Sequence, residues 1–161
     1  MDFSNEYILM CVEADELQYN YEFKVGDYIA GKWFIDNNGN IGWTTLGLVK
    51  KIRNDQRDCG RYGYLDTGGD IFWDPAVTKC IFRQDQLQEI YLNWCDDGEL
   101  KKSSNSTIVI LDDFQDWVLN RALFVEFDSL EKYWLAFVMY KKYSKVWNGS
   151  IWNDCYLYKP N

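Results

Sequence analysis

The segment from Ser129 to Trp152 constrains the fold most, because a helix start, an apolar stripe and a tight turn follow one another within it. Asp128 or Ser129 can cap the helix, and Glu131 is available for the reciprocal bond of a capping box. At about 100° per residue, one helix face carries apolar and aromatic side chains: Leu130, Tyr133, Ala136, Phe137, Tyr140 and Trp147. The segment therefore predicts an amphipathic helix over Ser129–Val146.

Two apolar residues of this helix, Leu135 and Val138, fall on its polar face, which also carries Glu131, Lys142 and Lys145. Either another segment of the chain covers them, or they form part of a contact surface. Coverage by the chain itself is the simpler interpretation. The second alternative makes Leu135 and Val138 candidate partner-binding residues.

The first half of the chain is predicted to be rich in antiparallel strands. Apolar ranges flank turn-forming residues twice: 28–35 and 41–49 around 36–40, and 62–65 and 71–73 around 66–70. Asn, Asp and Gly tolerate positive φ, so each arrangement is typical of a β-hairpin. Further strands are predicted at Tyr7–Val12 and Thr78–Phe82, with a turn at Asp15–Asn20.

The second half is predicted to contain helices and one short strand. Arg83–Cys95 has apolar residues at the i, i+3, i+4 and i+7 positions of an amphipathic helix. Asp96–Ser106 is polar and predicts a loop, and β-branched Thr107–Leu111 predicts a strand. A short helix from Asp112 to about Leu123 should follow, although Ala122–Phe127 also fits a strand.

These elements predict an α+β fold: an antiparallel sheet built largely from hairpins, with two main amphipathic helices packed on it. The chain has 161 residues, of which 47% are hydrophobic. That length and composition suit one domain over residues 1–161.

The residue types present argue against most enzymes. The chain contains no His, which is the commonest general base and metal ligand. Its five Cys, at 11, 59, 80, 95 and 155, include no Cys-x-x-Cys pair, so neither a disulfide framework nor a zinc site is predicted. We expect a non-enzymatic protein with no cofactor, no metal and no catalytic residues. No apolar span or signal segment is found, which predicts a cytoplasmic location without membrane contact.

Asp66-Thr67-Gly68 resembles the Asp-Thr-Gly motif of aspartic proteases, in which two such Asp share a proton. This chain has one copy, and a second could come only from a homodimer. A hairpin turn explains the residues equally well.

Asp36, Asn38 and Asn40 are spaced like the first ligands of a calcium-binding EF-hand loop. Ile41 stands where that loop needs Gly, and Gly47 stands where it needs Glu. We therefore interpret this segment as a turn.

Charge points to a basic partner. The chain has 25 acidic and 17 basic residues, a net charge of −8, which repels nucleic acid and attracts basic surfaces. Candidate acidic residues form two bunches: Asp96, Asp97 and Glu99, then Asp112, Asp113 and Asp116. They can mimic phosphates toward a basic groove, or simply serve helix ends and a solvated loop. Glu13, Asp15 and Glu16 form a third bunch.

Two segments carry a family resemblance. Phe82–Ile90, and Ser129–Met139 continuing through Tyr143, Lys145, Trp147-Asn148-Gly149 and Trp152, resemble small proteins of phages and prophages of low-GC Gram-positive bacteria. The resemblance covers about a fifth of the chain and carries over no catalytic residues. It implies an origin in a mobile element, and small acidic phage proteins often disable host defences.

Combined with the charge, the resemblance favours an inhibitor of the anti-CRISPR or anti-restriction type, which binds the basic groove of a host defence nuclease. One alternative is a small-ligand protein for a nucleotide signal, with Lys50, Lys51, Arg53, Arg57 and Arg61 as a local basic run. Another is an accessory or structural phage protein.

Overall fold

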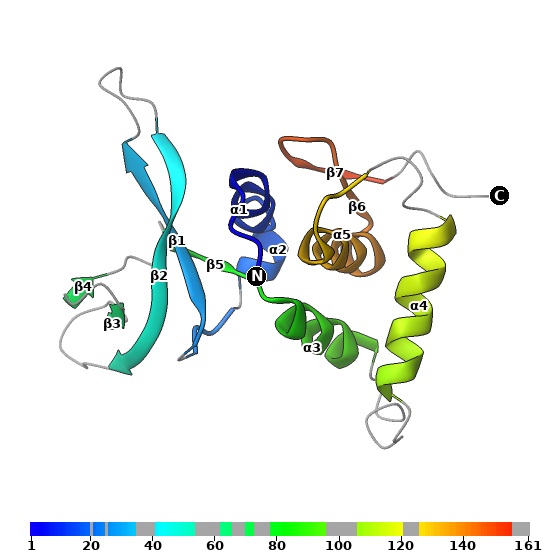
Figure 1. Ribbon diagram of the computed structural model, residues 1–161, viewed down its shortest axis with the longest axis horizontal. Helices are drawn as coiled ribbons and strands as arrows, with labels where there is room; N and C mark the ends of the chain where they lie inside the picture. The colour runs from blue at the N-terminus through cyan, green and yellow to red at the C-terminus, as the bar shows by residue number, and fades with distance from the viewer. Residues whose placement is uncertain are drawn as a thin grey trace. The chain divides into compact units, whose positions relative to one another are not determined.

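The computed structural model describes residues 1–19, 21–24, 26–34, 41–53, 62–65, 70–72, 78–95, 106–120 and 126–155 (Figure 1). The chain divides into two compact units, which we call the sheet unit and the helical unit. The sheet unit is Phe3–Phe82, and the helical unit is Met1–Asp2 together with Arg83–Asn161. Helices and antiparallel sheets are both present, which confirms the α+β class. The single domain remains a prediction.

The sheet unit contains a five-stranded sheet in the order β4-β3-β2-β1-β5, with antiparallel neighbours throughout. Its strands are β1 Tyr28–Phe34, β2 Ile41–Arg53, β3 Tyr62–Leu65, β4 Asp70–Phe72 and β5 Thr78–Ile81. β1 pairs with β2 and β3 with β4, so both predicted hairpins are confirmed, as is the strand after Thr78. The turn residues 36–40 and 66–69, with the calcium-like and protease-like motifs, lie outside the described residues.

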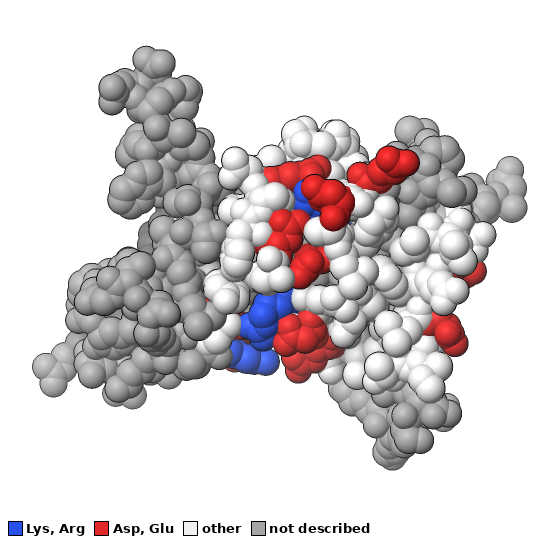
Figure 2. Space-filling view, in the orientation of Figure 1, with Lys and Arg blue, Asp and Glu red and all other residues white. Residues whose placement is uncertain are grey.

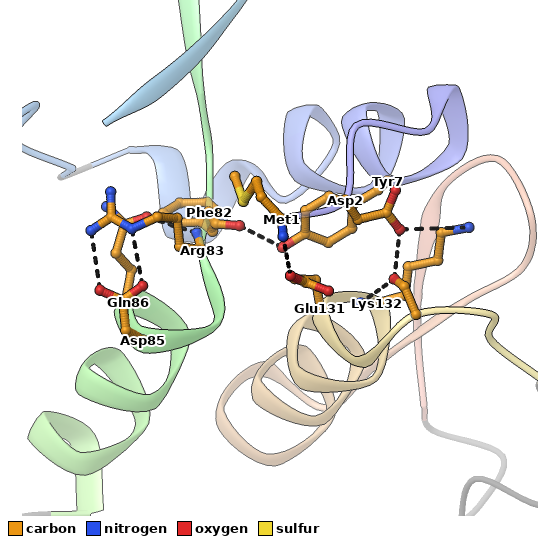
Figure 3. A network of polar contacts seen from close by, with 10 residues as sticks. Met1, Asp2, Tyr7, Phe82, Arg83, Asp85, Gln86, Glu131 and Lys132 are labelled. Atoms are coloured by element: carbon orange, nitrogen blue, oxygen red, sulfur yellow. Dashed lines mark hydrogen bonds and ion pairs between the residues drawn. The ribbon is translucent and has the colours of Figure 1, made fainter. Parts of the chain in front are cut away.

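The strand predicted at Tyr7–Val12 is wrong, because this segment is the helix α1, Asn5–Val12. Ser4 caps it by accepting a hydrogen bond from the backbone N–H of Tyr7 at 3.2 Å. The apolar run is buried over most of the helix, and a short run of that kind does not distinguish a buried strand from a buried helix. α1 packs against β2 and β5, and the Tyr7 hydroxyl donates to the carbonyl oxygen of Phe82 at 2.6 Å (Figure 3).

The turn predicted at Asp15–Asn20 is also corrected. Asp15–Gln18 is the short helix α2. It has two acids in its first turn, where negative charge interacts favourably with the helix dipole. Lys79 of β5 donates to Asp15 at 3.1 Å. These acids therefore serve a helix end and an ion pair.

The helical unit contains α3 Gln84–Cys95, α4 Ser106–Asn120, α5 Leu130–Tyr143 and a hairpin of β6 Lys145–Trp147 and β7 Trp152–Asp154. α3 confirms the predicted amphipathic helix. Inside this unit α3 and α5 pack against each other, and both pack against α4. Their packing on the five-stranded sheet remains a prediction.

α5 starts as predicted but ends earlier. Ser129 is the N-cap, and its Oγ accepts from the backbone N–H of Lys132 at 3.3 Å. Glu131 makes no capping box; it pairs with the α-amine of Met1 at 2.9 Å (Figure 3). Ser144 takes a left-handed conformation, with φ of 56°, and ends the helix. Trp147 therefore leaves the predicted helix stripe and faces Trp152 across the β6–β7 hairpin.

The strand predicted at Thr107–Leu111 and the helix start predicted at Asp112 are both wrong. Ser106–Asn120 is one continuous helix, α4. Ile110, Phe114 and Trp117 lie at i, i+4 and i+7, which places them on one helix face. Packing of this face overrides the β-propensity of the short branched run.

Candidate protein-binding surface

One side of α4 is fixed in the helical unit by aromatic packing. Phe114 stacks on Trp134 of α5, with ring centroids 4.1 Å apart and an interplanar angle of 5°. Trp117 contacts the rings of Phe137 and Tyr140, also of α5. Ile110 and Trp117 are each only 6% exposed. This packing determines which face of α4 is turned away from the core.

The opposite face of α4 combines apolar and acidic side chains. Its large apolar residues are well exposed: Ile108 at 58%, Val109 at 44%, Leu111 at 46% and Leu119 at 61%. Asp112 and Asp116 are exposed between them. Figure 2 shows acidic atoms over α4 surrounded by uncharged atoms. We call these six residues the α4 surface.

Asp113, the third acid of α4, is occupied inside the unit. The Tyr91 hydroxyl of α3 donates to Oδ2 of Asp113 at 2.6 Å, and Nζ of Lys141 on α5 donates to Oδ1 at 3.1 Å. Burial raises the pKa of Asp113, but the hydrogen bonds from Tyr91 and Lys141 outweigh it and hold this pKa below its usual range. Asp113 is therefore an ionised residue that connects three helices.

Burial also raises the pKa of Tyr91, and the hydrogen bond to Asp113 raises it further. The phenol therefore stays protonated and keeps donating at every pH at which the protein is normally handled. We therefore interpret the hydrogen bond between Tyr91 and Asp113 as a structural contact.

Asp112 and Asp116 differ from Asp113 in their partners. Among the described residues neither has a basic partner, and Asp116 accepts a hydrogen bond from the Asn120 side chain at 2.7 Å. Both carboxylates are exposed. They can accept hydrogen bonds and ion pairs from another molecule.

The structure separates the residues that the sequence predicted as partner-binding. Asp112, Asp113 and Asp116 share α4, and two of the three are exposed. Asp96, Asp97 and Glu99 lie outside the described residues. Leu135 and Val138 are both fully buried, so we remove them from the candidate surface. Of the third bunch, Asp15 pairs with Lys79.

The exposed apolar residues of the α4 surface were missed by sequence reasoning. The β-branched run Thr107–Leu111 predicts a strand, and a strand gives Ile108, Val109 and Leu111 no helix face. A usable signal existed in the spacing of Ile110, Phe114 and Trp117, which predicts a helix whose other side carries Ile108 and Leu119.

No group of three or more Cys, Asp and Glu in the described part of the chain could hold a metal ion. None of the helices that the structure describes combines the length and apolar composition that a membrane crossing needs.

No family model, curated protein or solved structure matches this chain.

Proposed function

We propose that this protein is a phage-encoded, non-enzymatic inhibitor that binds the basic nucleic-acid groove of a bacterial defence nuclease. The phage origin is supported by the sequence resemblance described above. The mode of action is supported by charge and by the α4 surface.

The net charge of −8 favours a basic partner at long range. The negative electrostatic field of this charge speeds the encounter with a positively charged groove and disfavours binding to nucleic acid itself. Among the described residues of the helical unit, ten acids stand against five Lys and Arg. Several of these bases are already paired, as in Arg83–Asp85, Lys132–Asp128 and Lys141–Asp113. The acidic excess therefore remains available to another molecule.

The exposed pair Asp112 and Asp116 is the observation that carries the proposal. Two carboxylates at i and i+4 on a rigid helix hold negative charges in fixed positions, as a phosphate backbone does. Phe114, Trp117 and Asp113 hold α4 in place within the helical unit. Binding of a partner therefore costs little conformational entropy in α4. The apolar side chains around the acids add area that becomes buried on contact.

A cleavage assay tests this proposal directly. Purified CRISPR effector nucleases and restriction enzymes of low-GC Gram-positive hosts are mixed with their DNA substrate and increasing amounts of the protein. We expect cleavage by at least one nuclease to stop at saturation, and this inhibition to weaken as salt rises. Full cleavage by every nuclease at saturating protein would remove the proposal.

A charge-matched pair of variants sharpens the test. Asp112→Lys/Asp116→Lys should abolish inhibition, since it turns two attractive charges into repulsive ones. Glu89→Lys/Glu126→Lys changes the net charge by the same amount at exposed acids outside α4. This control should keep most of the inhibition, and an equal loss in both variants would mean that only total charge matters.

A further inference from the structure

We propose that the α4 surface binds a helix of the partner protein that carries an apolar stripe beside Lys or Arg side chains. This inference rests on the proposed function, because it names the segment of the basic partner that the surface receives.

Three of the four exposed apolar residues of the α4 surface lie in one row along the helix, and Gln115 lies in the same row between Leu111 and Leu119. At about 100° per residue, Leu111, Ile108 and Leu119 fall within about 80° of arc on the helix. Their exposed fractions, 46%, 58% and 61%, are those of side chains that few neighbours cover. A row of this kind is the counterpart of the apolar stripe of an amphipathic helix.

The acids form a second row directly beside the first. Asp112 and Asp116 lie next to Ile108 and Leu119 on the helix surface, one turn apart. A partner that offered only apolar side chains would leave both carboxylates desolvated without a cation, which is unfavourable. The partner stripe therefore needs Lys or Arg along one edge, at a spacing of one helical turn.

The length of the surface sets the size of the partner segment. Ile108 and Leu119 are separated by about 17 Å along the helix axis, at 1.5 Å per residue. A partner helix of about three to four turns covers this distance.

Charge argues against a second copy of this chain as the occupant. Antiparallel pairing of two α4 helices about their middle brings Asp112 of one copy near Asp116 of the other. Like charges at such a contact oppose association. Charge complementarity thus favours a basic partner over self-association.

A synthetic peptide serves as the probe. It is an amphipathic helix of about 14 residues, made of Leu and Lys, with Leu on one stripe and Lys along its edge. A peptide of the same composition, reordered to have no stripe, is the reference. Binding is measured by fluorescence anisotropy, and the contact is located by amide chemical shifts in the ¹⁵N-labelled full-length protein. We expect tighter binding of the striped peptide, with shifts concentrated over 108–119.

Two pairs of variants test the apolar row. Ile108→Ser/Leu119→Ser should raise the Kd at least about tenfold, since it removes the two most exposed apolar side chains of the row. Leu130→Ser/Ile151→Ser removes apolar side chains that are 49% and 48% exposed elsewhere in the helical unit. This control should leave the Kd within about twofold. Circular dichroism checks that all variants stay folded.

The acid row is tested by Asp112→Asn/Asp116→Asn, which should weaken binding and reduce its dependence on salt. Equal binding of both peptides, equal losses in the two serine pairs, or shifts away from α4 would overturn the inference. So would concentration-dependent shifts over 108–119 without peptide, which would reveal self-association through this face.

The nuclease assay separates this inference from the proposed function. If the unaltered protein inhibits no nuclease, the proposed function fails whatever the peptide does. If it inhibits a nuclease and Ile108→Ser/Leu119→Ser inhibits equally well, only the assignment of the α4 surface fails.

Discussion

Tyr91 of α3 donates a hydrogen bond to Asp113 of α4, with an oxygen–oxygen distance of 2.6 Å. Because Lys141 of α5 donates to the other oxygen of the same carboxylate, Asp113 connects all three helices. The three acids of α4 thus divide into one that holds the helix in place and two that face outward.

Replacing Tyr91 with Phe tests the value of this bond. The variant keeps the ring, which lies 4.6 Å from the ring of Phe137, and removes only the hydroxyl. Hydrogen bonds to charged groups contribute about 1.5–3 kcal/mol, and Asp113 is partly exposed, so we expect a loss near the lower limit. Urea denaturation measures the free energy of unfolding. Tyr140→Phe on α5 is the control, since no hydrogen bond of its hydroxyl to a described residue is found. A loss no larger than that of the control would contradict the prediction.

The lowered pKa of Asp113 predicts how stability responds to acid. Burial raises this pKa, but the hydrogen bonds from Tyr91 and Lys141 lower it more, so the folded value lies below the unfolded value of about 3.9. The ionised Asp113 carboxylate therefore makes its full contribution to the free energy of unfolding above the unfolded pKa. This contribution is lost as pH falls through the folded pKa.

The variant Asp113→Asn removes this titration. Its free energy of unfolding should be lower than that of the unaltered protein near neutral pH, and the difference should shrink as pH falls below about 4. Urea denaturation at several pH values between neutrality and pH 3 measures the difference. A difference that stays constant over this range would show that the ionised carboxylate contributes nothing specific.

Local sequence signals predicted several elements well. Asn, Asp and Gly between apolar ranges indicated both hairpins, and the four-residue stripe of Arg83–Cys95 indicated α3. These signals succeed because a hairpin turn or a half-exposed helix depends on residues close together in sequence. Ser129 was one of the two residues predicted to cap α5, for the same reason.

Elements that depend on distant packing were predicted wrongly. Tyr7–Val12 is apolar throughout, so its pattern does not distinguish a helix from a strand. Thr107–Leu111 is β-branched, yet packing of Phe114 and Trp117 keeps it helical. Ser144 ends α5 without Gly or Pro to mark the position. The candidate surface shows the same limit: its acids were found from sequence, whereas the exposure of Ile108 and Leu119 depends on which face of α4 is packed.

Lys132 is predicted to be a major contributor to stability in the helical unit. Its side chain is 2% exposed, and Nζ lies 2.7 Å from Asp128 and 4.0 Å from Asp2. The variant Lys132→Ala leaves Asp2, which is only 10% exposed, without this cation. Removing one partner of a buried ion pair is destabilising because the other charge is left uncompensated, and exposure of Asp128 should keep the loss below that of a fully buried pair. Lys142→Ala, at a less buried position of the same helix, is the control and should have little effect in thermal denaturation. Similar losses in both variants would refute the prediction.

The left-handed conformation of Ser144 predicts a stabilising substitution. Residues with a Cβ are strained by roughly 1 kcal/mol in this conformation, whereas Gly is not. Ser144→Gly should therefore raise the free energy of unfolding by about 0.5–1 kcal/mol. Ser144→Val, which adds a branched side chain at φ of 56°, should lower it. Guanidinium denaturation of the two variants ranks them, and the reverse order would show that another feature ends α5.

Gln18 is predicted to protect an edge of the five-stranded sheet. β5 lies at one end of the strand order, and its Cys80 donates its backbone N–H to Oε1 of Gln18 at 2.9 Å. Nε2 of Gln18 donates to the carbonyl oxygens of Cys80 at 2.9 Å and of Cys11 at 2.8 Å. One side-chain amide thus takes the place that a further strand would occupy, and it ties the end of α1 to the sheet.

Removing this amide should destabilise the sheet unit. Each hydrogen bond contributes about 1 kcal/mol, so Gln18→Ala should lower the free energy of unfolding by about 2 kcal/mol after allowance for access of water. Gln18→Glu should be at least as damaging, because a carboxylate facing two carbonyl oxygens loses both donors. Gln88→Ala, whose side chain has no hydrogen bond to a described residue, is the matched control. Hydrogen exchange of the Cys80 amide should speed up in both Gln18 variants. Unchanged exchange in Gln18→Ala would mean that the edge of β5 is protected by some other contact.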